Sequence, residues 1–185
     1  MAGGVHKKVL MLETKIKSAI RDVPNFPKQG IMFKDITPIL KDHLLSSEII
    51  DEMAKRVAIL KPDALACVEA RGFLFGFMLA NKLQIPFIPV RKKGKLPYQT
   101  NSYEYSLECG TATVEMHIDA VKPGSRVLIH DDLLATGGTA AAAAELIQMQ
   151  KGEIAGFAFI INLDFLDGKQ VLNKYSDQVI SLINY

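Results

Sequence analysis

The sequence predicts an α/β protein in which a parallel, twisted sheet is flanked by helices. Three apolar runs lack the polar–apolar alternation of a strand with one wet face, as expected for strands covered on both sides. They are ALACV at 64–68, VLI at 127–129 and IAGFAFIINL at 154–163. The first two runs are each followed by a turn and a stretch with helical character. With 185 residues, we expect a single domain spanning 1–185.

The composition excludes several classes of protein. Hydrophobic residues make up 49% of the chain, which is ample for a core, yet no apolar run reaches the ~18 residues of a membrane span. The first residues, MAGGVHKKV, lack the apolar stretch of a secretory signal. Cys67 and Cys109 form no CxxC or Cys/His cluster, so we expect neither disulfides nor zinc, and a reducing cytoplasm fits. A net charge of +2 is too small to indicate nucleic acid, and we expect no membrane partner either.

The first expected element is an amphipathic helix near the N-terminus. Apolar side chains recur there at helical spacing, with lysines on the other side. The apolar set is Val9, Leu12, Ile16, Ala19 and Ile20. Such a helix packs on its own domain or on a partner subunit. A basic amphipathic helix can also bind membranes, but Glu13 and the modest basic excess favour packing.

Residues 22–40 come next, and Pro24, Pro27 and Gly30 break regular structure there. The segment carries a heavy apolar load for a loop. These residues are Phe26, Ile31, Met32, Phe33 and Ile36. A loop of this kind covers either the edge of a core or a ligand, and the residues alone favour neither.

A helix follows, with Ser46 or Ser47 as its N-cap and Pro62 just after its end. Its buried face is Ile49, Met53, Val57 and Leu60. The run 64–68 is then a buried strand, in which Cys67 is most simply a core residue.

The stretch EARGFLFGFMLANKL at 69–83 reads as a strand-to-helix turn and an apolar helix. Arg71 in that turn points to the C-terminal edge of the sheet, where open α/β folds bind ligands. The alternative is a helix-start arginine paired with an acid.

A strand over 85–90 follows, and its prolines predict limited pairing. A basic run comes directly after it: Arg91, Lys92, Lys93 and Lys95. Such a run is either simply solvated or placed to neutralise a pyrophosphate leaving group.

Residues 98–110 lack a long apolar face and read as an exposed β-ribbon or a mobile loop. Residues 111–118 alternate polar with apolar, which predicts a half-buried strand. A mobile loop beside a phosphate site would act as a lid that excludes water. We therefore expect a flexible loop over about 95–113.

The stretch RVLIHDDLLATGGT, Arg126–Thr139, reads as a buried strand, two acids, a small-residue loop and a helix start. Asp131 and Asp132 fall where the strand should leave the sheet. Backbone N–H groups of the loop and of the first helical turn can converge on one point, which makes a phosphate site. The two carboxylates could accept hydrogen bonds from sugar hydroxyls or hold a Mg²⁺. The alternative is an ordinary βα turn with surface acids.

The remaining chain continues the α/β pattern. Residues 154–163 form a fully apolar strand, Asp167-Gly168 is a turn, and 178–183 is a last strand. His130, just before the two acids, is interpreted as a core or supporting histidine rather than a catalytic one.

Four stretches together resemble the adenine-specific branch of the type I phosphoribosyltransferase family. HDDLLATGGT resembles its motif for phosphoribosyl diphosphate (PRPP), and FPKQGIMFKDITPIL resembles its N-terminal hood over the base site. RKKGKLP resembles its RK-[RK]-GKLP stretch, and YSLECG resembles its catalytic loop, Y-[SD]-L-E-Y-G. Cys109 stands where that loop usually has tyrosine, and Glu69 where an aspartate or a small polar residue is more common.

The resemblance implies Mg²⁺-dependent transfer of a 5-phosphoribosyl group from PRPP to N9 of adenine, giving AMP and pyrophosphate in purine salvage. It implies a homodimer and the type I fold. Glu108 is the implied catalytic residue, which handles the proton on the purine. The implied adenine contacts are Met32, Phe33, Lys34 and Leu163. The implied contacts to ribose and 5-phosphate are Asp131, Asp132, Ala135, Thr136, Gly137, Gly138 and Thr139. The implied pyrophosphate contacts are Arg71, Arg91, Lys92 and Lys95. The implied metal is Mg²⁺ bound to PRPP, with Asp131 and Asp132 nearby.

Two rival functions stay open. A regulatory protein could bind PRPP without turnover, but it would need a DNA-binding domain, and the helix at 9–20 is too little for one. A 6-oxopurine phosphoribosyltransferase would lack the Phe33 hood and read the base where this chain has Asn162 and Leu163. A P-loop nucleotidase is excluded because no GxxxxGK[ST] occurs.

Overall fold

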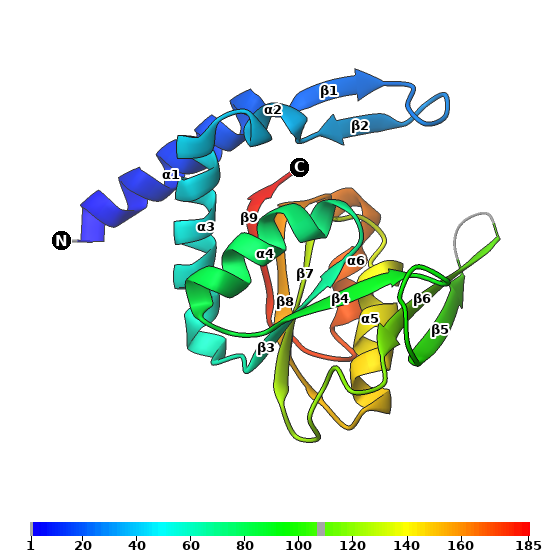
Figure 1. The fold of residues 1–185 in the computed structure, drawn as a ribbon. Helices are drawn as coiled ribbons and strands as arrows, with labels where there is room; N and C mark the ends of the chain where they lie inside the picture. Colours follow the sequence, from blue (N-terminus) through cyan, green and yellow to red (C-terminus); the bar gives the residue numbers. More distant parts are fainter. Residues whose placement is uncertain (1, 107–109) are drawn as a thin grey trace. The chain divides into compact units, whose positions relative to one another are not determined.

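The computed structural model describes residues 2–106 and 110–185, and the chain divides into two compact units, 1–52 and 53–185 (Figure 1). The helices are α1 (Ala2–Ala19), α2 (Thr37–Leu40), α3 (His43–Val57), α4 (Arg71–Leu83), α5 (Gly138–Met149) and α6 (Gly168–Leu172), with 3₁₀ turns η1 (Ala58–Leu60) and η2 (Asp164–Leu166). The strands are β1 (Arg21–Pro24), β2 (Met32–Asp35), β3 (Ala64–Val68), β4 (Phe87–Lys92), β5 (Thr100–Ser106), β6 (Thr111–His117), β7 (Arg126–Leu134), β8 (Glu153–Asn162) and β9 (Val179–Asn184). Within the described residues, no helix is long and apolar enough to cross a membrane.

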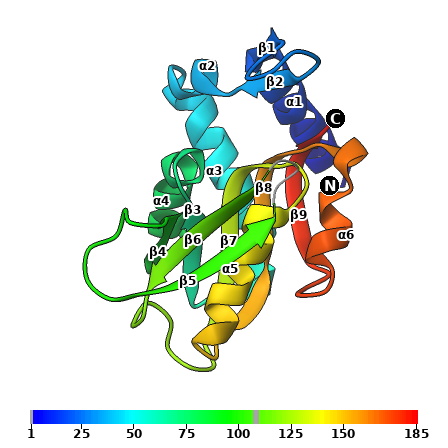
Figure 2. The same cartoon turned by 90° about the vertical axis from the view of Figure 1, so that its right-hand side faces the viewer.

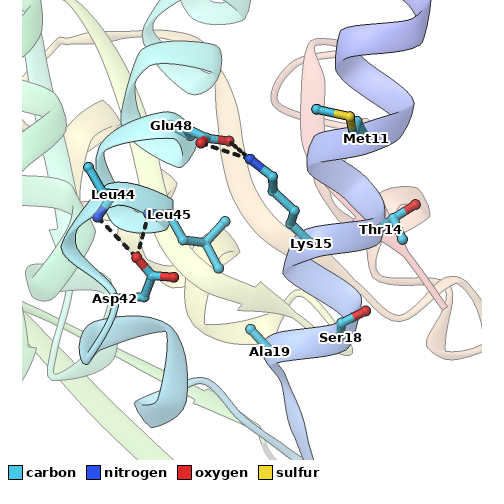
Figure 3. A pocket seen from close by; sticks show the side chains of 9 residues that line it. All are labelled: Met11, Thr14, Lys15, Ser18, Ala19, Asp42, Leu44, Leu45 and Glu48. Atoms are coloured by element: carbon cyan, nitrogen blue, oxygen red, sulfur yellow. Dashed lines mark hydrogen bonds and ion pairs between the residues drawn. The ribbon is translucent and has the colours of Figure 1, made fainter.

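The first unit confirms the amphipathic helix near the N-terminus. Leu12 and Ile16 of α1 are buried, as is Ile20 directly after the helix. Lys15 Nζ lies 2.8 Å from both carboxylate oxygens of Glu48, at the start of α3. The ion pair lies at a hollow of about 660 Å³ between α1 and the start of α3 (Figure 3).

Helix α3 begins at His43, earlier than the predicted N-cap at Ser46 or Ser47. Asp42 provides the cap, because its Oδ1 accepts hydrogen bonds from the N–H groups of Leu44 and Leu45 at 3.1 and 3.0 Å. The Ser46 hydroxyl instead donates to the carbonyl of Ile39 at 3.1 Å.

The hood segment is more regular than its prolines and glycine suggest. Strands β1 and β2 pair antiparallel, with Pro24 opposite Met32. The breakers lie at the end of β1 and in the turn, where Gly30 has a φ of +88° and its N–H bonds to Asn25 Oδ1 at 2.9 Å. The segment is thus a short hairpin followed by the single turn of α2.

The second unit confirms the α/β class. Its seven-stranded sheet has the order β5-β6-β4-β3-β7-β8-β9. Neighbours from β4 through β9 are parallel, whereas β5 and β6 form an antiparallel ribbon that joins the edge of β4. Helix α4 covers one face of the sheet and α5 the other (Figures 1 and 2).

The pleat of the central strands divides the core between these helices. Ala64, Ala66 and Val68 of β3 join the cluster that packs on α5. Cys67 faces α4 instead, where a Cβ on Gly76 would collide with its sulfur. The predicted core position of Cys67 is confirmed, and burial raises the pKa of its thiol.

Strand β4 pairs with β3 from Phe87 to Val90 but with β6 only over Arg91 and Lys92, as its prolines predicted. Strand β7 runs farther than expected. It stays paired with β8 through Leu134, so Asp131 and Asp132 lie within the C-terminal part of the strand and not beyond its end.

Candidate active site

The small-residue loop after β7 lines a hollow of about 80 Å³. Asp131 and all five predicted loop residues, 135–139, contribute to its wall. Helix α5 starts at Gly138, and the N–H groups of a first helical turn have no acceptor within the helix. Together with the helix dipole, these donors favour an anion in the hollow.

Glycine is required in this loop for two reasons. Gly137 has a φ of +82°, and a Cβ added to it would lie 2.8 Å from the carbonyl oxygen of Gly168. A Cβ on Gly168 would in turn collide with the carbonyl oxygen of Ala135. The loop therefore packs backbone to backbone against the start of α6, which fixes its shape.

The two acids at the end of β7 differ in their surroundings. Asp132 is 2% exposed, and its Oδ2 lies 3.0 Å from Nε of Arg71, in the first turn of α4. Asp131 borders the hollow, and its Oδ1 accepts the N–H of Asp132 at 2.8 Å. Burial raises the pKa of Asp131, and the adjacent Asp132 carboxylate raises it further. Arg71 thus lies at the sheet edge, as predicted, and is paired with one of the acids.

The basic run begins within β4, which ends at Lys92 and not at the expected residue 90, and Glu69 ties this run to the turn after β3. Glu69 Oε1 accepts a 2.8 Å hydrogen bond from Nη2 of Arg91, and its Oε2 accepts the N–H of Lys92 at 3.1 Å. The bond to Arg91 lowers the pKa of Glu69, although burial acts in the opposite direction. The side chains of Lys92, Lys93 and Lys95 are exposed, so the basic run divides into a paired arginine and three accessible lysines.

Two further residues of this region had no role predicted from the sequence. The Tyr105 hydroxyl, on β5, lies 3.0 Å from that of Thr139. The carboxylate of Glu115, on β6, binds the backbone of the basic loop at Lys95 and Leu96. Both contacts join segments far apart in sequence, so no local pattern could reveal them.

The predicted base contacts fall in different units. In the first unit, Phe33 on β2 stacks edge-on against Phe26, with ring centroids 5.0 Å apart, and Lys34 Nζ lies 2.7 Å from Asp22 Oδ1. In the second unit, Leu163 follows β8 and is 9% exposed. Glu108 and Cys109 lie outside the described residues.

His130 is a core histidine, as interpreted from the sequence. It is 1% exposed, and its Nδ1 donates to the carbonyl of Ala158 at 2.9 Å. Burial lowers its pKa to about 4, so the ring is neutral at pH 7. It supports β7 directly before the two acids.

Comparison with known proteins adds a family assignment. The phosphoribosyl transferase domain family matches residues 37–184. An adenine phosphoribosyltransferase from Cytophaga hutchinsonii is 57% identical over 175 residues, which cover 95% of this chain and 97% of that protein.

Solved structures agree with that assignment. The adenine phosphoribosyltransferase of Thermoanaerobacter pseudethanolicus superposes with a TM-score of 0.90 at 51% identity, covering 93% of this chain and 99% of that one. The Saccharomyces cerevisiae enzyme, solved with adenine and an imino-altritol bisphosphate, gives a TM-score of 0.86 at 37% identity, covering 94% and 99%.

Proposed function

Because the chain belongs to the phosphoribosyl transferase family, among its adenine phosphoribosyltransferases, we propose that its site transfers the 5-phosphoribosyl group of PRPP to N9 of adenine. The products are AMP and pyrophosphate, a purine salvage reaction. The observation that carries the proposal is the hollow that Asp131 shares with residues 135–139. It combines phosphate donors with a carboxylate, as a phosphorylated sugar requires.

The 5-phosphate of PRPP binds in this hollow. The backbone N–H groups of the loop and of the first turn of α5 provide the donors, and the hydroxyls of Thr136 and Thr139 add to them. Asp131 and Asp132 accept hydrogen bonds from the ribose hydroxyls. Both carboxylates are positioned before substrate binds, one by a backbone N–H and the other by Arg71.

The pyrophosphate of PRPP binds on the cationic side of the site. Lys92 and Lys95 supply exposed ammonium groups, and Arg71 and Arg91 complete the predicted set. As the bond from C1 of ribose to pyrophosphate breaks, these cations stabilise the charge on the leaving group. Positive charge develops on C1 at the same time, and exclusion of water protects this centre until N9 attacks.

The hood segment provides the adenine contacts. In this proposal Phe33 stacks on the purine, the main chain at Met32 and Lys34 reads the base edge, and Leu163 adds an apolar contact with the base. Stacking alone cannot distinguish adenine from a 6-oxopurine, so this edge reading carries the specificity. Glu108 accepts or relays the proton that N9 loses as its bond to C1 forms.

Mg²⁺ fits this site as a companion of PRPP. Within residues 2–106 and 110–185, no three His, Cys, Asp or Glu side chains gather into a metal site. Asp131 and Asp132 are the hard oxygen donors available, so most ligands would come from PRPP itself. When bound, the metal would neutralise charge on the pyrophosphate.

We also propose a homodimer in the cytoplasm. The exposed side of α4 carries large apolar residues in the single chain: Leu74 is 45%, Phe77 63% and Met78 42% exposed. Clustered apolar residues of this kind favour a protein contact. The buried, free thiol of Cys67 is compatible with a reducing compartment.

The test supplies PRPP and Mg²⁺ with adenine, hypoxanthine or guanine in parallel reactions. We expect AMP and pyrophosphate from adenine alone. Product from hypoxanthine or guanine instead would assign the 6-oxopurine reaction. Tight PRPP binding with no product from any base would leave a regulatory protein.

A further inference from the structure

Glu115 is buried on a face of β6 where alternation predicts a solvated side chain. Val114 and Met116, on either side of it, join the core that packs on α5. The pleat therefore turns Glu115 to the opposite face, yet it is only 4% exposed. A carboxylate is buried at this level only when its oxygens have partners.

These partners come from the loop that carries the basic run. Glu115 Oε1 accepts the N–H of Lys95 at 3.0 Å and that of Leu96 at 2.9 Å, and its Oε2 accepts the Thr100 hydroxyl at 3.3 Å. Burial by itself raises the pKa of Glu115, but the hydrogen bonds donated by these backbone groups and by Gly94 outweigh it and lower the pKa. The side chain is therefore a charged acceptor for a turn of backbone.

Arg91 also holds this turn. It lies opposite Glu115 in the antiparallel register of β4 and β6. Arg91 Nη1 donates to the carbonyl of Lys95 at 2.8 Å, and its Nη2 donates to Glu69. The N–H of Lys95 is thus bound by Glu115 and its C=O by Arg91. Its backbone is fixed on both sides, while its ammonium group is exposed.

We propose that Glu115 is a positioning residue of the transferase: it holds the 93–96 turn so that Lys95 meets the pyrophosphate of PRPP beside Lys92. The inference rests on the proposed function, because that function assigns pyrophosphate to these lysines. Glu115 itself touches no substrate. Its effect passes through the backbone of Lys95, so geometry matters more than its charge.

The substitutions that separate these roles are Glu115→Gln, Glu115→Asp and Glu115→Ala. The amide oxygen of Gln can accept both backbone N–H groups, and its NH₂ can donate to Thr100, so the turn keeps its shape. Asp is one methylene shorter and cannot span the same distance, and Ala removes the acceptor. We expect Glu115→Gln to leave the KM for PRPP within about twofold, and the other two to raise it about tenfold or more, with the KM for adenine within about twofold.

Gln150→Ala is the matched control. Gln150 is also a buried polar side chain that holds a loop, through the N–H of Val121 and the carbonyl of His117. It should lose stability without a change in the KM for PRPP. If Glu115→Ala does not fold, Glu115→Asp carries the comparison, since it keeps the charge and most of the volume.

Binding of pyrophosphate with Mg²⁺, measured by calorimetry for the same variants, separates the two claims. A wild-type chain that makes no AMP would end the proposed function, and the calorimetric series would still decide the role of Glu115. An unchanged pyrophosphate affinity in Glu115→Asp would overturn the inference, as would an equal loss in Gln150→Ala.

Discussion

The hydroxyl of Tyr105, on β5, lies 3.0 Å from the hydroxyl of Thr139, in the first turn of α5. The Tyr105 ring is also 3.4 Å from the place that a Cβ on Gly138 would occupy. The strand that leads to residues 107–109 is therefore anchored on the loop assigned to the 5-phosphate. We therefore expect that binding of the 5-phosphate at that loop and the conformation of the β5–β6 ribbon are coupled.

Tyr105→Phe tests this coupling, because it removes one hydrogen bond and keeps the ring. The KM for PRPP should rise about two- to tenfold, the weight of one neutral hydrogen bond. Tyr175→Phe is the control, since Tyr175 also donates to α5 but at Glu145, beyond the first turn that holds Thr139. Steady-state kinetics that give equal KM values for both variants would contradict the coupling.

Gly137→Ala should disable the phosphate loop. The variant meets both a φ of +82° and the carbonyl oxygen of Gly168, so we expect it to lose about 1–3 kcal/mol of stability and to bind PRPP more weakly. Gly124→Ala shares the strain, with a φ of +79°, but has open space around it. Urea unfolding and PRPP titration of both variants would show whether the collision adds to the strain, and identical results would mean that it does not.

Phe33→Ala should raise the KM for adenine much more than that for PRPP. The ring is assigned to stack on the base, an interaction worth about 1–3 kcal/mol by analogy with base stacking in single-strand binders. Phe26→Ala removes its neighbour in the hood and is the natural comparison. Equal increases in both KM values would remove Phe33 from the base site.

Glu108→Ala should lower kcat about 10²–10⁴-fold, the usual weight of general acid–base catalysis. Glu104→Ala, on the preceding strand, removes a carboxylate without this assigned role. Near-normal turnover of the Glu108 variant in single-turnover measurements would take this residue out of the mechanism.

His130 should make the protein less stable as the pH falls. Burial lowers its pKa to about 4 in the folded state, below the ordinary value of 6.5, so the unfolded chain binds a proton that the folded chain does not. Between pH 7 and pH 5 the free energy of unfolding should fall by about 2 kcal/mol from this residue alone.

The measurement compares urea unfolding of wild type and His130→Leu at those two pH values. The variant should lose about 2 kcal/mol less. The raised pKa values of Asp131 and Asp132 act in the opposite direction, but they act in both proteins and drop out of the difference. Parallel losses would refute the buried neutral state of His130.

Local patterns predicted most of the fold. Apolar runs located β3, β7 and β8, and helical spacing located α1, because burial on one or both faces leaves a period in the sequence. The predicted N-cap of α3 was wrong because serine and aspartate cap helices about equally well, so the sequence does not decide between Asp42 and the two serines. In the structure Asp42 is the cap. The β1–β2 hairpin was not predicted because prolines usually break strands, whereas here Pro24 ends β1 and Pro27 lies in the turn.

The site was predictable where its residues are contiguous and not where they meet across the sheet. The loop 135–139 and its adjacent acid are one stretch of chain, and the structure brings them to one hollow. Glu115 carries no such signal, because its partners at Lys95 and Leu96 approach only when the ribbon folds back along β4. Its burial is a tertiary property that alternation along β6 cannot encode.

The pairing of Arg71 with Asp132 depends on β3 and β7 being neighbours in the sheet, although β4, β5 and β6 lie between them in the chain. During synthesis, Arg71 leaves the ribosome long before its carboxylate partner exists. An N-terminal fragment that ends before β7 would expose both the arginine and the unpaired edge of β3. We therefore expect the anion site to appear late in folding, together with the centre of the sheet, since such long-range parallel pairing is slow to form.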